Sequence, residues 1–119
     1  MPVISGRAWD WGTDKETYSR GDTATGWTNI TNTGTVPIDE ICFTVTIEKL
    51  IFGFPVERSY SHTMKGLDIA PGETRKVQFS ERIPAKYKGI PTAGNYKFNV
   101  TAWLDNKDIG NYTKNIKVI

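Results

Sequence analysis

Strict alternation between apolar and other residues near the C-terminal end constrains the fold of this chain more than any other feature. The apolar members of the alternation are Tyr96, Phe98, Val100, Ala102 and Leu104. In an extended strand successive side chains point to opposite faces, so this pattern places one row in a core and the other row in solvent. A turn signal at 105–107 follows, and a second extended run carries Ile116 and Val118. The two runs predict a β-hairpin.

The same layout recurs along the rest of the chain, with turn residues between short extended runs. Further strands are predicted at residues 3–11, 23–32, 41–48, 50–60 and 74–83, with a short one at 67–69. Pro55 has no N–H for a ladder hydrogen bond, so the run at 50–60 is predicted to be an edge strand or a bent one. Irregular structure is expected at residues 13–20, 61–71 and 84–94, with one helical turn at 85–88.

No helical stretch separates these runs, which is typical of an all-β sandwich or barrel. A chain of 119 residues forms one domain, so residues 1–119 are predicted to be a single unit. Seven to nine strands in this length suit two antiparallel sheets packed face to face. In the clearest apolar run, the residues expected on the buried face are Ile41, Phe43, Val45 and Ile47.

The first two runs predict which side chains point outward. In the run at 3–11, one face is expected to hold Ser5, Arg7, Trp9 and Trp11, and the other Ile4, Gly6 and Ala8. In the run at 23–32, the inward row is predicted to be Ala24, Gly26, Thr28 and Ile30. This row is unusually small, so we expect a large ring from the facing sheet to fill the space beside Gly26. Trp27 would then face outward.

Charge and composition exclude several classes of partner. Fifteen basic residues against thirteen acidic ones give a net charge of +2, and no basic cluster is longer than Arg75-Lys76, which disfavours nucleic-acid binding. No apolar run approaches the roughly 20 residues that span a bilayer, so membrane insertion is not expected. Cys42 is the only cysteine, so an internal disulfide cannot form. The first six residues lack the regions of a secretion signal, which indicates either a protein not secreted by that route or a mature domain or fragment.

Four segments carry a resemblance to a known group of modules. They are Tyr18-Ser19-Arg20-Gly21-Asp22, Thr31-Asn32-Thr33-Gly34, Ile69-Ala70-Pro71-Gly72-Glu73-Thr74 and Pro91-Thr92-Ala93-Gly94-Asn95-Tyr96. Their order and spacing over residues 16–119 resemble immunoglobulin-like modules of archaeal and bacterial surface proteins. The resemblance implies an immunoglobulin-like β-sandwich. It leaves the function open, because such modules serve as spacers, adhesins, inhibitors, enzyme accessories and virion decorations. The small inward row of 23–32 departs from the branched aliphatic residues usual there.

Two kinds of short motif suggest surface roles. Arg20-Gly21-Asp22 spells a tripeptide that adhesion receptors read, but the same residues form the turn needed before the next strand, and the turn is the favoured interpretation. N-glycosylation acceptor patterns begin at Asn29, Asn99 and Asn111. Abundant threonine accounts for such patterns by chance, although their number favours a location outside the cell.

Tryptophan is frequent for so small a domain. Under the predicted registers, the side chains that project outward are Trp9, Trp11, Trp27 and Trp103. Exposed flat rings stack on sugars in carbohydrate-binding modules and anchor protein interfaces. Two other interpretations stay open: a register shifted by one residue would bury each ring, and rings can simply cover sheet edges.

Catalytic chemistry finds little support. His62 has no carboxylate beside it in sequence, and Cys42 lies in mid-strand rather than at an activating helix N-terminus. The residues show no zinc ligand set and no phosphate-binding glycine loop, so no cofactor is expected. Two acidic groups, one of Asp10, Asp14 and Glu16 and one of Asp105 and Asp108, suit weak calcium binding, but solvated carboxylates are the favoured interpretation and no metal site is predicted.

These observations predict a non-catalytic cell-surface or assembly module that contacts another protein or a copy of itself in an adhesive, spacer or structural role. The alternatives are a carbohydrate-binding module that uses the exposed tryptophans, a protease inhibitor with a projecting loop at 86–93, and a virion decoration protein. The expected location is extracellular or in the cell envelope, or on a virion surface.

Overall fold

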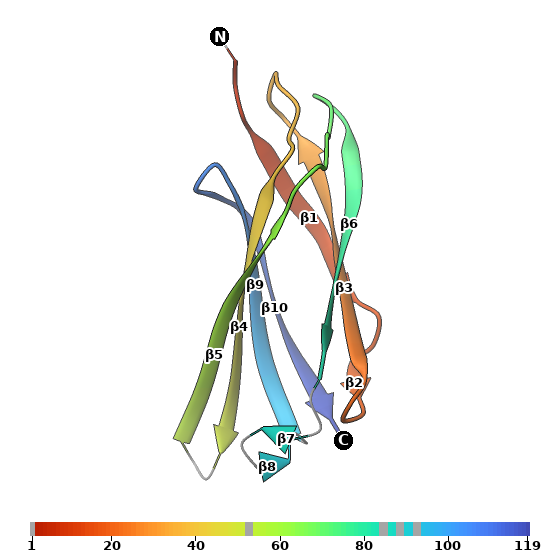
Figure 1. Ribbon diagram of the computed structural model, residues 1–119, viewed down its shortest axis with the longest axis vertical. Helices are drawn as coiled ribbons and strands as arrows, with labels where there is room; N and C mark the ends of the chain where they lie inside the picture. The colour runs from red at the N-terminus through yellow and green to blue at the C-terminus, as the bar shows by residue number, and fades with distance from the viewer. Residues whose placement is uncertain (1, 52–53, 84–85, 88–89, 92–93) are drawn as a thin grey trace.

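The computed structural model describes residues 2–51, 54–83, 86–87, 90–91 and 94–119, which form strands and no helix (Figure 1). The strands are β1 (Gly6–Thr13), β2 (Thr17–Tyr18), β3 (Thr23–Asn32), β4 (Ile41–Ile51), β5 (Phe54–Met64), β6 (Thr74–Arg82), β7 (Lys86–Tyr87), β8 (Ile90–Pro91), β9 (Gly94–Leu104) and β10 (Lys107–Val118). Seven of these strands have eight or more residues and build the two main layers.

The strands form two facing sheets of three and five strands (Figure 1). The smaller sheet has the order β1-β3-β6 and the larger the order β2-β10-β9-β4-β5, while β7 and β8 pair separately. The first, second and fifth long strands of the chain lie in one layer, and the third, fourth, sixth and seventh in the other. This is the arrangement of an immunoglobulin-like sandwich in which the fourth long strand pairs with the third instead of joining the smaller sheet. The predicted fold class is therefore confirmed, although β2 pairs with β10 in parallel, so the larger sheet is not purely antiparallel.

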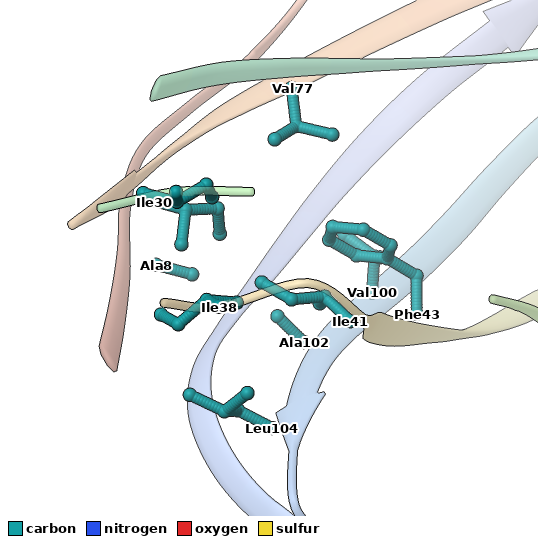
Figure 2. Close-up of a cluster of buried hydrophobic side chains, with 10 residues drawn as sticks. Ala8, Ile30, Ile38, Ile41, Phe43, Val77, Val100, Ala102 and Leu104 are labelled. Carbon is teal, nitrogen blue, oxygen red and sulfur yellow. The ribbon is translucent and has the colours of Figure 1, made fainter. Parts of the chain in front are cut away.

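The core lies between the two sheets, as the alternation predicts. Figure 2 shows Phe43 and Val100 of the larger sheet facing Ile30 and Val77 of the smaller one. The Phe43 ring is 5.6 Å from the ring of Phe79, centroid to centroid. Phe79 and Phe98 are partly buried and pack against the core cluster, so all three phenylalanines occupy the expected inward positions.

The outward position predicted for Trp11 is wrong, because a β-bulge reverses the alternation in β1. Asp10 adopts a positive φ of 56°, and the register with β3 shifts between Trp9 and Gly12. Trp11 consequently turns inward, where its ring meets Phe43 edge-on at 6.3 Å and stacks on Tyr112 at 6.2 Å. Asp tolerates this backbone conformation better than most residues, so Asp10 suits the bulge position.

The inward row of β3 is confirmed, but the ring beside Gly26 comes from a different place than predicted. Gly26, Thr28 and Ile30 are buried. A Cβ atom on Gly26 would lie 2.6 Å from the ring of Phe79, which is the directly paired residue on β6. The ring therefore belongs to the neighbouring strand of the same sheet rather than to the facing sheet.

Several predicted boundaries need correction. The segment 13–20 contains β2, whose Tyr18 is 1% exposed, and β5 extends to Met64 where a loop was predicted from residue 61. β5 does lie at the edge of the larger sheet, as Pro55 indicates. The predicted helical turn at 85–88 is wrong for 86–87, which belong to β7. Its other two residues lie outside the described part of the chain, as do two residues of the predicted interruption at 52–55.

The buried side chain of Tyr18 forms hydrogen bonds within the segment that connects β1 to β3. The Tyr18 hydroxyl donates a hydrogen bond of 2.6 Å to Asp14 Oδ1, and it accepts one of 3.2 Å from the Lys15 amide. Asp14 Oδ1 also accepts a hydrogen bond from the Thr25 amide at 3.1 Å. Burial, reinforced by this bond to Asp14, raises the pKa of Tyr18 to about 12, and the same bond lowers the pKa of Asp14.

This network predicts a loss of stability in strong alkali. The neutral form of Tyr18 is favoured in the fold, so its contribution is complete below pH 10 and is lost as the pH rises towards 12. We expect tyrosinate absorbance of the folded protein to rise at high pH and Tyr18→Phe to remove part of that rise, while Tyr96, whose pKa burial also raises, keeps its share. The substitution should also lower the free energy of unfolding by about 1–2 kcal/mol. A tyrosinate titration curve that is the same in Tyr18→Phe as in the unaltered protein would contradict this prediction.

Candidate functional site

The outer face of the three-stranded sheet brings two tryptophans and two cations together. We call it the tryptophan face and define it by Arg7 and Trp9 of β1, Trp27 and Asn29 of β3, and Lys76 of β6. Trp9, Asn29 and Lys76 lie in one cross-strand row, and Trp27 occupies the adjacent row opposite Gly12. Paired residues of an antiparallel sheet share a face. Since Ala8 and Ile30 point into the core, this row points outward.

A glycine seats the indole of Trp27. A Cβ atom on Gly12 would lie 2.4 Å from Cζ2 of Trp27 and 2.6 Å from its Cε2. The ring therefore lies over the bare backbone of β1, and its position depends on the absence of a side chain there. Lys76 Nζ is 4.8 Å from the centroid of the same ring, within the range of a cation–π contact.

A hydrogen bond orients the second indole. Trp9 Nε1 donates to Thr31 Oγ1 at 2.8 Å, and Thr31 in turn shares a hydrogen bond of 2.7 Å with Thr74. The guanidinium of Arg7 lies 5.9 Å from the ring centroid. Trp9 is 38% exposed, so much of its ring remains accessible while its orientation is fixed.

Charge on the tryptophan face is predominantly positive. Arg7 and Lys76 lie within it, and the nearby carboxylate of Asp10 accepts a hydrogen bond of 3.2 Å from Asn29 Nδ2. Asn29 is also the first of the three glycosylation acceptors, so a glycan attached there would cover the face.

The other two tryptophans lie elsewhere. Trp103 is on the outer face of the five-stranded sheet, where its Nε1 donates to Thr44 Oγ1 at 2.8 Å, and Trp11 is inside. The structure therefore does not gather the four predicted rings into one platform. Sequence reasoning missed Gly12 and the two cations, because their roles depend on which residues pair across strands.

The remaining surface motifs occupy strands and turns. Asn99 and Asn111 lie on the outer face of the five-stranded sheet, and Asn99 Nδ2 donates to Thr113 Oγ1 at 2.8 Å. At 19–22, the Asp22 amide donates to the Ser19 carbonyl at 3.0 Å and Gly21 has a φ of 88°, which is the predicted structural turn.

The residues considered for catalysis or calcium lie apart from the tryptophan face or are already engaged. His62 is exposed on β5, and Cys42 is half-buried in β4. Asp108 Oδ1 accepts a hydrogen bond from the Gly110 amide at 2.9 Å, and Asp105 lies in the hairpin turn with a φ of 52°. Within the residues that the structure describes, no group of three histidine, cysteine or acidic side chains is placed to hold a metal ion. The same residues include no helix long and apolar enough to span a membrane.

Comparisons with known proteins support the fold. No family model and no curated protein sequence matches the chain. Among solved structures, it resembles part of the alkylpurine DNA glycosylase AlkC of Pseudomonas fluorescens, with a TM-score of 0.67 and 9% identity over 97% of this chain and 30% of that one. It resembles part of the sporulation control protein Spo0M of Bacillus subtilis, with a TM-score of 0.58 and 15% identity over 98% of this chain and 50% of that one.

A third similar structure is a glucanotransferase. The chain matches part of a cycloisomaltooligosaccharide glucanotransferase from Paenibacillus sp., with a TM-score of 0.62 and 26% identity over 98% of this chain and 14% of that one. The chain thus spans half or less of each of these three proteins. The chain therefore has the fold of an immunoglobulin-like β-sandwich. Its membership of the archaeal and bacterial surface family stays a prediction.

Proposed function

We propose that the chain is a non-catalytic contact module of a cell-surface protein, and that the tryptophan face is its working surface. The observation that carries the proposal is the pre-positioning of two indoles on one flat face. Trp9 is held by its hydrogen bond to Thr31, and Trp27 rests on Gly12. Tryptophan and arginine are enriched among residues that dominate binding energy. Rings already fixed in the free protein lose little conformational freedom on binding.

The positions of the two chain ends suit a module that is linked end to end with neighbouring domains. The N-terminal and C-terminal ends lie at opposite ends of the molecule, whose longest extent is 54 Å (Figure 1). Neighbouring domains attached at these ends would extend along the long axis and leave the outer faces of both sheets accessible. This arrangement supports a spacer or adhesive role.

Two partner classes fit such a surface, a protein and a carbohydrate. Protein contact agrees with the composition of the tryptophan face. Carbohydrate binding gains support from the third similar structure, a glucanotransferase complexed with cycloisomaltoheptaose. The inhibitor alternative gains no support here, because the segment 86–93 is described only in part.

Hydroxyl-radical footprinting of the full protein in its own cell envelope tests whether the tryptophan face is covered. We expect oxidation of Trp9 and Trp27 to fall severalfold relative to the purified protein, while oxidation of Trp103, on the opposite sheet, stays the same. Protection of Trp103 instead, or of neither face, would reject the proposed surface. Turnover of a substrate that is lost in His62→Ala would reject the non-catalytic assignment.

A further inference from the structure

We infer that the ligand of the tryptophan face is an acidic polysaccharide, a chain of pyranose rings that carry carboxylate groups. The inference rests on the proposed function, because it names the chemistry that would cover the same surface. It comes from a feature that occurs twice on this face: each outward indole has its own cation.

Each of the two pairs combines an indole ring with a cation. Arg7 lies 5.9 Å from the ring centroid of Trp9, and Lys76 lies 4.8 Å from that of Trp27. A uronic acid unit presents an apolar C–H face and a carboxylate on one ring. On binding, the C–H face can pack against the indole in place of the cation that now lies over it, and the displaced cation can neutralise the carboxylate. Acidic side chains of a protein partner offer the carboxylate without the ring face.

The spacing of the two pairs places both within reach of one extended chain. Trp9 and Trp27 occupy diagonal positions on adjacent strands, and such positions are about 7–8 Å apart. Lys76 lies two strands away from Trp9 in the same row, which is about 10 Å at the usual strand separation. An extended polysaccharide laid across the three strands would therefore meet both pairs in turn.

Charge distinguishes this face from the opposite one. Besides Arg7 and Lys76, Arg82 is exposed at the end of β6, where it pairs with the outward Thr23. Asp10 is the acidic group of the β1 bulge, and its carboxylate bonds to Asn29. On the five-stranded sheet, by contrast, the outward charges include the directly opposed Glu48 and Lys97. An anionic ligand is thus complementary to the tryptophan face, whereas this pair of charges on the five-stranded sheet offsets itself.

Binding of polygalacturonate and alginate, measured by calorimetry on the full chain with dextran as a neutral comparison, tests the inference. We expect both acidic polymers to bind and dextran not to bind. Trp9→Ala and Trp27→Ala should each weaken binding at least about tenfold, and Trp27→Phe less. Gly12→Ala should weaken binding while keeping every ring, because the added Cβ displaces Trp27. The double variant Arg7→Gln, Lys76→Gln should lose most of its affinity for the acidic polymers, and the affinity that remains should no longer depend on salt concentration.

Trp103→Ala and Lys97→Gln are the matched controls on the opposite sheet, and their binding should change less than about twofold. Circular dichroism confirms folding of each variant. Three results would overturn the inference. The first is binding that is lost in the cation variants but kept in the tryptophan variants, which would indicate simple ion exchange. The others are dextran binding as strong as that of the acidic polymers, and poly-L-glutamate binding that is equally strong and depends on the tryptophans. If footprinting shows the face covered while the acidic polymers fail to bind, this inference falls and the proposed function stands.

Discussion

Replacing Phe43 with alanine is expected to lower the free energy of unfolding by about 3–5 kcal/mol. Phe43 is 1% exposed and lies at the centre of the contact between the sheets (Figure 2). Its ring meets Phe79 of the smaller sheet at 5.6 Å and the inward-turned Trp11 at 6.3 Å. Truncation removes both contacts and leaves a cavity that neighbouring strands cannot close, because their ladders fix their separation.

Urea unfolding followed by circular dichroism measures this loss. Since a domain of this kind has a total stability of about 5–15 kcal/mol, the variant should be close to its folding limit. Phe43→Leu, which keeps part of the volume, should lose less. Thr46→Ala on the same strand, whose side chain points outward to a hydrogen bond with Ser59, should change stability by no more than about 0.5 kcal/mol. A loss below about 1 kcal/mol in Phe43→Ala would show that the sheets are not packed through this ring.

The strands most accurately predicted from the sequence are those whose alternation is uninterrupted. Residues 42–48 and 97–103 hold a continuous register with each other in the sheet, from Cys42 opposite Trp103 to Glu48 opposite Lys97. Each face of such a strand has one environment, so period-2 patterning is enough to assign it.

The errors arise where a contact distant in sequence decides the local structure. Nothing in residues 6–13 requires a bulge at Asp10, and the inward turn of Trp11 depends on space between Phe43 and Tyr112. Tyr18 is buried because β2 leaves the first sheet and pairs with the end of β10, about a hundred residues later in the chain. Local polarity around residues 13–20 therefore indicated a loop.

The same distinction applies to the tryptophan face. The outward position of Trp27 follows from the small inward row of β3, and the sequence predicts it. Its partners come from the two neighbouring strands: Gly12 of β1 lies beneath the ring, and Lys76 of β6 lies over it. Which residues meet the ring depends on the register of each strand with β3, and the bulge shifts that register in β1. The alternation in the sequence therefore identifies the outward tryptophan rings but not the residues that hold them in place.

Replacing Asn32 with alanine is the second large effect that we expect, a loss of about 2–4 kcal/mol in the free energy of unfolding. Asn32 is 1% exposed at the end of β3. Its Nδ2 donates to the carbonyl oxygens of Val36 at 2.8 Å and Ile69 at 2.9 Å, and its Oδ1 accepts from the Gly34 amide at 2.8 Å. One side chain thus joins two loops that are far apart in sequence. Its removal takes away the acceptor of the Gly34 amide and the donor to the Val36 carbonyl, both partly buried, while the Ile69 carbonyl keeps its bond from the Ile38 amide.

Hydrogen exchange distinguishes this mechanism from a simple loss of volume. In Asn32→Ala, the Gly34 amide should lose protection together with the loss of global stability, because its acceptor is gone. Asn32→Asp should be worse than alanine near neutral pH, since a carboxylate would face two carbonyl oxygens with no proton to donate. Asn29→Ala is the matched control, because Asn29 lies on the same strand with its side chain outward, hydrogen-bonded to Asp10. The backbone of residue 32 also forms two hydrogen bonds, from its amide to the Glu73 carbonyl and from the Gly72 amide to its own carbonyl. Unchanged protection of the Gly34 amide in Asn32→Ala would mean that these backbone bonds are enough to hold both loops.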